Sequence, residues 1–96
     1  MFDKMKELME MKKQADQIKR ELDTVSVEVT EVRGIKIVIN GSQDIKSLEI
    51  EESLLGVPNK KRLENDLSRS LNMAIKKSQQ VAAQKMKNLM PGFPGL

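Results

Sequence analysis

Residues 35–50 read IKIVINGSQDIKSLEI, and this stretch decides the fold. Isoleucine stands at every second position of its first five residues, which is the period of a strand with one buried face. Asn40-Gly41 is a strong turn signal, and apolar residues resume at Leu48 and Ile50. The stretch therefore predicts a β-hairpin.

The register of this hairpin follows from the same pattern. A two-residue turn at Asn40-Gly41 would set Ile37 opposite Asp44, a charged residue. A four-residue loop that ends at Asp44 instead pairs Ile37 with Leu48, and the next apolar pair is Ile35 with Ile50. We predict the longer loop, because it keeps one face of the hairpin apolar.

A further strand is predicted just before the hairpin. Val25, Val27 and Val29 alternate with polar residues, and Arg33-Gly34 then interrupts the pattern before the hairpin begins. Consecutive strands joined by such short connections usually pair. The region 25–50 therefore predicts a three-stranded antiparallel sheet.

A long helix is predicted before this sheet in the sequence, over residues 3–22, and another after it, from Asn59 onward. Asp3 suits the positive end of the first helix dipole, and Asn59 is a plausible N-cap for the second. Both segments carry apolar or small side chains at steps of three, four or seven residues. The seams are Leu8, Met11, Ala15, Ile18 and Leu22 in the first helix, and Leu63, Leu67, Leu71, Ala74, Ser78, Ala82 and Leu89 in the second. The predicted fold class is α+β, with element order α-β-β-β-α.

The lengths of these elements predict an oligomer. A second helix of about 30 residues would reach roughly 45 Å, whereas strands of five or six residues span only about 17–20 Å. The sheet cannot cover the whole apolar stripe of either helix, so we predict a homodimer. We expect a single domain over 1–90 and a flexible Pro/Gly tail over 91–96.

Composition argues against several classes of chemistry. The chain of 96 residues contains no His, Cys, Trp or Tyr, which excludes zinc fingers, thiol nucleophiles and Ser-His-Asp triads. The acidic pair Glu51–Glu52 has no further ligands at calcium-loop spacing. We therefore expect no enzyme, no catalytic or metal-binding residue, no cofactor and no small-molecule substrate. No run approaches the length of a membrane span, and the absence of cysteine fits a cytoplasmic protein.

Charge is segregated along the chain. Residues 59–96 hold eight basic side chains against two acidic ones, and no acidic residue follows Asp66. Residues 24–58 hold three basic against six acidic side chains. Such segregation favours a polyanionic partner, although a basic helix face kept for solubility would give the same pattern.

The order and spacing of these segments resemble the YbaB/EbfC family of nucleoid-associated proteins. The resemblance covers nearly the whole chain. It is carried by MKELMEMKKQ at 5–14, VEV at 27–29, IKIVING at 35–41, LEI at 48–50 with SLL at 53–55, and MPGFPG at 90–95. It implies small bacterial homodimers of tweezer-like outline that bind DNA, alter its shape, and influence nucleoid organisation and gene expression.

This sequence departs from the family pattern at two places. The usual Gly-rich turn between the first two strands is reduced to Val32-Arg33-Gly34. Where the family often has acidic residues at the start of the second helix, this chain has Lys60, Lys61 and Arg62, whose role the sequence leaves open.

We interpret the basic half of the second helix as the main DNA-binding surface, because Lys and Arg side chains bind phosphates. After Asp66 its cations have no acidic neighbour in their own segment, and Lys76 and Lys77 are both expected to face solvent. The expected contacts are Arg69, Lys76, Lys77, Lys85 and Lys87, with Lys12, Lys13, Lys19 and Arg20 of the first helix as secondary candidates.

Two alternatives remain at this stage. The basic helix could instead belong to a dimeric adaptor that binds an acidic protein. Attachment to anionic lipid ranks lower, because the second helix lacks the aromatic anchors that such helices use.

Overall fold

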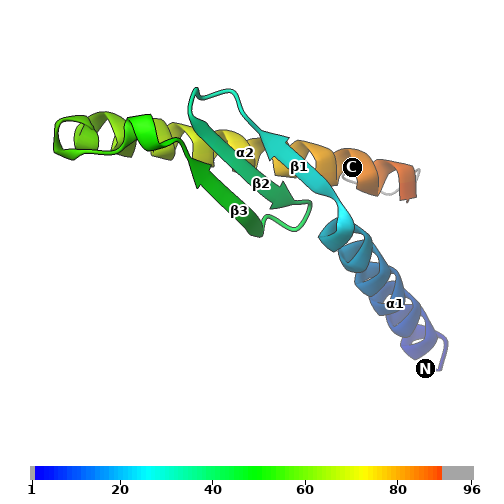
Figure 1. Cartoon of the computed structure of the whole chain (residues 1–96). Coiled ribbons are helices and arrows are strands. Elements are labelled where there is room, and N and C mark those ends of the chain that lie inside the picture. The colour runs from blue at the N-terminus through cyan, green and yellow to red at the C-terminus, as the bar shows by residue number, and fades with distance from the viewer. Residues whose placement is uncertain (1, 90–96) are drawn as a thin grey trace.

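The computed structural model describes residues 2–89 and has the element order expected from the sequence (Figure 1). The helices are α1 (Phe2–Thr24) and α2 (Lys60–Leu89), and the strands are β1 (Ser26–Val29), β2 (Ile35–Asn40) and β3 (Ile45–Ile50). Two short 3₁₀ turns, Glu52–Leu54 and Val57–Asn59, connect β3 to α2. The α-β-β-β-α prediction is confirmed. The tail expected at 91–96 lies outside the described residues.

The three strands form one antiparallel sheet in the order β1-β2-β3. Ile35 pairs with Ile50 and Ile37 with Leu48, which confirms the predicted register. The pairing slips by one residue between Val38 and Ile39, a β-bulge next to the loop. The amide of Asn40 donates to the carbonyl of Asp44 at 3.0 Å and closes the hairpin.

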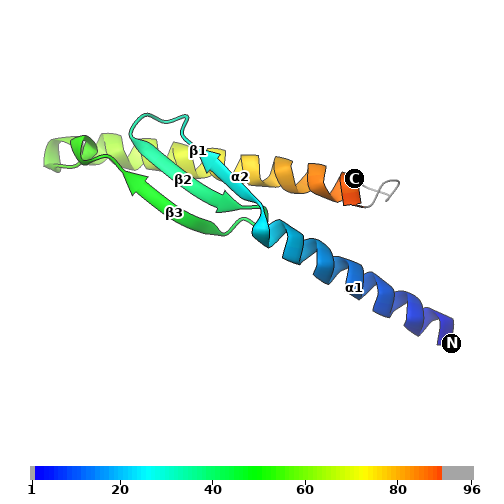
Figure 2. The same cartoon turned by 45° about the vertical axis from the view of Figure 1, so that its right-hand side comes forward.

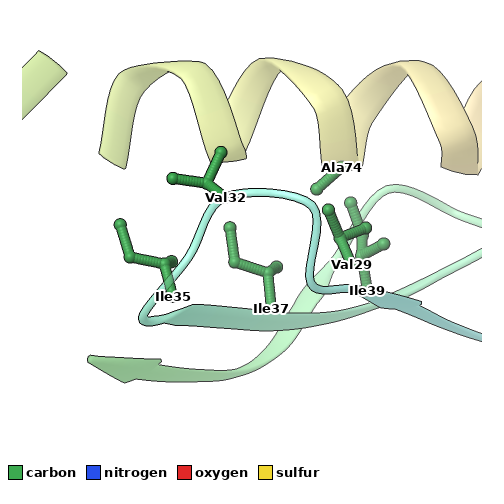
Figure 3. Close-up of a cluster of buried hydrophobic side chains, with 6 residues drawn as sticks. All are labelled: Val29, Val32, Ile35, Ile37, Ile39 and Ala74. Atoms are coloured by element: carbon green, nitrogen blue, oxygen red, sulfur yellow. The ribbon is translucent and has the colours of Figure 1, made fainter. Parts of the chain in front are cut away.

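The core lies between one face of the sheet and α2 (Figures 2 and 3). Its buried apolar residues are Val29, Val32, Ile35, Ile37, Ile39 and Ala74. The isoleucines of β2 point at α2, as their alternation predicts. Val32 was not expected there: it comes from the β1–β2 loop and turns its side chain toward α2, where only 3% of it is exposed.

The face of α2 that meets the sheet is made of small residues. Ser70, Ala74 and Ser78 follow at steps of four and are fully buried. The Ser78 hydroxyl donates to the carbonyl oxygen of Asn40 at 2.7 Å, whereas the Ser70 hydroxyl has no hydrogen-bond partner among the described residues. The two serines therefore lie on the same buried face of the helix, but one hydroxyl stabilises the fold through a hydrogen bond and the other is buried without a partner.

Replacing Ser70 by Ala is expected to raise the free energy of unfolding by about 1 kcal/mol, because an unsatisfied buried hydroxyl costs about 1–3 kcal/mol. Ser78→Ala is expected to lower it by about 1 kcal/mol, because it removes a buried hydrogen bond to the Asn40 carbonyl, which then keeps only the longer one from the Gln43 amide at 3.3 Å. Urea unfolding at one fixed protein concentration measures both. A loss of stability in Ser70→Ala equal to that in Ser78→Ala would show that Ser70 has a partner in solution.

Helix α1 is joined to the rest of the protein at the β2–β3 loop. The Gly41 amide donates to the carbonyl of Leu22 at 2.9 Å. The Asn40 side-chain oxygen accepts from the amides of Ser42 (3.0 Å) and Asp44 (2.9 Å), and the Ser42 hydroxyl donates to the Asp23 carboxylate, which lowers the pKa of Asp23. We call this arrangement the α1 joint.

Beyond this joint α1 leaves the sheet and diverges from the C-terminal half of α2 (Figures 1 and 2). The protein is consequently elongated, at 66 × 19 × 18 Å. Met5 and Leu8 of α1 are each 64% exposed, and Ile45 and Leu48 of β3 are 46% and 43% exposed. The predicted excess of uncovered apolar surface is therefore present in the single chain.

Candidate nucleic-acid interface

The outward face of α2 carries a row of cations. Arg62, Arg69 and Lys76 follow at seven-residue steps, about 10.5 Å apart along the axis, and Lys87 continues them toward the C-terminal end. All four are exposed, and they lie on the side of the helix opposite the buried Ser70, Ala74 and Ser78. We call these four residues the outward row.

Helix α2 has two acidic residues in its thirty, Glu64 and Asp66. Asp66 stands between two arginines of the outward row, at 3.7 Å from Arg62 Nε and 4.0 Å from Arg69 Nη2. The expectation that Arg69 has no acidic neighbour is therefore wrong. Both arginine side chains nevertheless remain 75% and 67% exposed, so their remaining donors are free to meet a phosphate.

Lys77 and Lys85 are placed differently from the outward row. The Lys77 ammonium donates to the Glu31 carboxylate in the β1–β2 loop, a hydrogen bond that lowers the pKa of Glu31. The Lys85 ammonium lies 3.7 Å from the Glu21 carboxylate on α1. Both lysine side chains are only 40% exposed. Lys77 thus faces solvent only in part, whereas it was expected to face solvent as fully as Lys76, and both lysines tie neighbouring elements to α2.

Two of the three cations at the start of α2, Lys60 and Arg62, have different roles. Lys60 lies 3.7 Å from Glu64, one helical turn ahead, which is a local pair on the helix surface. Arg62 belongs to the outward row. Sequence reasoning did not include Arg62 among the candidate contacts, although its seven-residue spacing from Arg69 and Lys76 was a usable signal.

The secondary candidates on α1 are all exposed: Lys12, Lys13, Lys19 and Arg20. Lys19 lies 3.7 Å from Asp23 in the last turn of the helix. The helix also carries as many acidic as basic residues over 1–23, so its net contribution to an anion-binding surface is smaller than that of α2.

Other kinds of site are not evident between residues 2 and 89. No group of three or more acidic side chains is placed to hold a metal ion there. In the same part of the chain no helix has the length and apolarity that crossing a membrane requires. A groove of about 350 Å³ does open between α1 and α2, and its lining is largely apolar, with Met11, Ile18, Leu22 and Met86.

The fold and this face define a class of protein: a small α-β-β-β-α chain whose long C-terminal helix exposes a row of cations. The profile of the YbaB/EbfC DNA-binding family matches residues 1–93, and the chain belongs to this family. The resemblance noted in the sequence is thereby confirmed.

Similar proteins agree with this assignment. A nucleoid-associated protein of Dictyoglomus thermophilum is 30% identical over 94 residues, which cover 97% of this chain and 90% of that protein. One from Hahella chejuensis is 34% identical over 92 residues, covering 88% and 84%. The crystal structure of an uncharacterized protein from Helicobacter pylori superposes with a TM-score of 0.75 at 21% identity, over 94% of this chain and 97% of that one, and so shares the fold.

Proposed function

We propose that this protein binds duplex DNA in the bacterial nucleoid, as a homodimer, with weak sequence specificity, and alters the conformation of the DNA. The single observation that carries the proposal is the outward row, four exposed cations on the face of α2 that points away from the core. The family's description as DNA-binding and the nucleoid-associated names of its relatives support it. A role in the nucleoid places the protein in the cytoplasm.

The mechanism follows from the chemistry of these side chains. Arginine and lysine contact phosphate oxygens, and each contact releases a condensed counterion, so affinity falls as salt rises. Such contacts fix the position of the protein on the duplex and carry no direct sequence information. Binding through the outward row is therefore mainly electrostatic.

A titration of the full chain with duplex DNA, heparin and anionic vesicles across a salt series tests this function. If the two protomers together contact six phosphates, the slope of log affinity against log salt is about −5, and affinity falls about a thousandfold between about 50 and 200 mM salt. We expect duplex DNA to bind and vesicles not to bind. Absence of any binding to DNA at low salt would favour the adaptor function instead.

The proposal of a dimer is based on the apolar surface that the single chain leaves exposed. Three apolar residues of α1 (Met5, Leu8, Met11) and two of β3 (Ile45, Leu48) are 43–64% exposed in the single chain. Two copies related by a two-fold axis can cover both surfaces at once, because in such an interface each copy contributes the same patch. A pair also doubles the number of cations presented to one duplex.

The double variant Leu8→Ala/Met11→Ala is expected to weaken the dimer at least about a hundredfold, because a large apolar side chain loses about 1.5–3 kcal/mol on leaving an interface. Sedimentation equilibrium measures the dissociation constant. The matched control is Lys6→Ala/Lys13→Ala, two truncations on the same helix, which should leave the dimer unchanged. A well-folded wild-type monomer at micromolar concentration would contradict the proposed dimer.

A further inference from the structure

A short unit recurs three times along the first two thirds of α2. Each unit begins with a cation and carries a side-chain carboxamide three residues later, and successive units start seven residues apart. The units are Arg62-Leu63-Glu64-Asn65, Arg69-Ser70-Leu71-Asn72 and Lys76-Lys77-Ser78-Gln79. At least one inner position of each unit faces the core (Leu63, Ser70 and Ser78), whereas the first and last positions are exposed in all three.

The helix geometry places the three carboxamides in a column beside the outward row. Residues three apart are neighbours on a helix surface, and a seven-residue repeat drifts only about 20° per step around a straight helix. Asn65, Asn72 and Gln79 therefore stay on the solvent side of α2 and run alongside Arg62, Arg69 and Lys76. They are spaced about 10.5 Å apart along the axis. We call Asn65, Asn72 and Gln79 the carboxamide column.

The side chains of the carboxamide column are not hydrogen-bonded within the described part of the protein. None of its three side chains takes part in a hydrogen bond with another residue of the described chain. Some carboxamides elsewhere in the chain do so: Asn40 accepts from the amides of its loop, Asn59 donates to the Leu55 carbonyl at 3.2 Å, and Gln84 donates to Asn88 at 3.5 Å. The column thus keeps its full donor and acceptor capacity for a ligand.

We propose that Asn65, Asn72 and Gln79 contact base edges in the major groove of the duplex while the outward row holds the neighbouring phosphates. This inference rests on the proposed DNA binding and adds direct readout to it. An α-helix fits the major groove, and the carboxamide of Asn or Gln pairs with the N6 donor and N7 acceptor of adenine in a bidentate contact. The surface therefore favours duplexes with adenines in register with the column, on top of phosphate binding that is independent of sequence.

The test is selection of duplexes from a randomised pool by the full-length protein, followed by titration of the selected duplex and of an unrelated one. For the wild type we expect enrichment of adenine-containing sites and a preference of about fivefold or more, since one good bidentate pair discriminates by at least about that factor. The variant Asn65→Ala/Asn72→Ala/Gln79→Ala should reduce the preference to about twofold or less. Its affinity for the unrelated duplex and its salt slope should stay unchanged.

Two controls make the outcome decisive. The variant Gln84→Ala/Asn88→Ala removes carboxamides that bond to each other outside the repeat, and it should keep the wild-type preference. Because all substituted positions are exposed, circular dichroism and sedimentation should match the wild type. Wild-type binding without any sequence enrichment, or an equal loss of affinity for both duplexes in the triple variant, would overturn base readout while leaving the proposed function intact. Absence of duplex binding by the wild type would overturn both.

Discussion

The double variant Arg69→Gln/Lys76→Gln is expected to lose at least about a hundredfold in duplex affinity at about 0.1 M salt. Two outward cations are removed from each protomer, hence up to four phosphate contacts from the dimer. The slope of log affinity against log salt should therefore become shallower by about 3–4. Fluorescence anisotropy over a salt series measures both quantities. The loss should be equal for unrelated sequences, because phosphate contacts do not read bases.

The matched control removes the same number of charges from the same helix. In Lys77→Gln/Lys85→Gln the lost cations are those paired with Glu31 and Glu21, so we expect the salt slope to change by less than about 1. The melting temperature should fall instead, because the β1–β2 loop and α1 each lose a tie to α2. If both double variants flatten the slope equally, net charge on α2 rather than the outward row determines binding.

The sheet could be predicted from the sequence because burial of one face constrains every residue of a strand. A slip of one residue would put the apolar residues of the two hairpin strands on opposite faces, and the loop length then followed from pairing Ile37 with Leu48 rather than with Asp44. Val32 was missed because a single apolar residue in a turn has no period. Its burial depends on how the β1–β2 loop folds over α2, which no local pattern encodes.

The candidate surface could be predicted only in part, for a related reason. The basic character of α2 is a property of one segment and is visible in the sequence. Which of its lysines pair with acidic residues is not visible in the sequence, because Lys77 contacts Glu31, which lies 46 residues away along the chain. A partner that distant is set by the packing of α2 on the sheet. In contrast, helical spacing alone groups Arg62 with Arg69 and Lys76, so Arg62 could have been identified as a candidate contact from the sequence.

A second large effect is expected at the α1 joint. A Cβ built on Gly41 would lie 2.9 Å from the Leu22 carbonyl oxygen and 3.3 Å from its Cα, both of which are backbone atoms. In Gly41→Ala the end of α1 must move away from the hairpin, and the 2.9 Å hydrogen bond from the Gly41 amide to Leu22 is stretched. Overpacking of this kind costs about 1–3 kcal/mol, and urea unfolding should show such a loss of stability.

The same substitution should also alter the direction of α1 relative to α2, because the joint is one of the few places where α1 touches the rest of the chain. The chain has no cysteine, so Lys13→Cys and Gln80→Cys accept spin labels at those two sites alone. Electron–electron distance measurements, with labelled chains diluted in unlabelled ones, should give a broader or shifted distribution in Gly41→Ala. If the helices of both protomers must contact the same duplex, this variant should also bind DNA more weakly, although its outward row is intact.

A control in the same loop distinguishes the effect of the contact between Gly41 and Leu22 from that of any substitution in this loop. Gln43 has a φ of 67°, a left-handed conformation that glycine adopts without a steric penalty. Gln43→Gly should therefore keep the stability within about 1 kcal/mol of the wild type, since relief of strain is offset by the greater freedom of glycine in the unfolded chain. It should also keep the distance distribution. A Gly41→Ala protein with wild-type stability and an unchanged distribution would show that the contact of Gly41 with Leu22 does not set the direction of α1. The ion pair between Lys85 and Glu21 would then be the next contact between the two helices to test, through the distance distribution of Lys85→Gln.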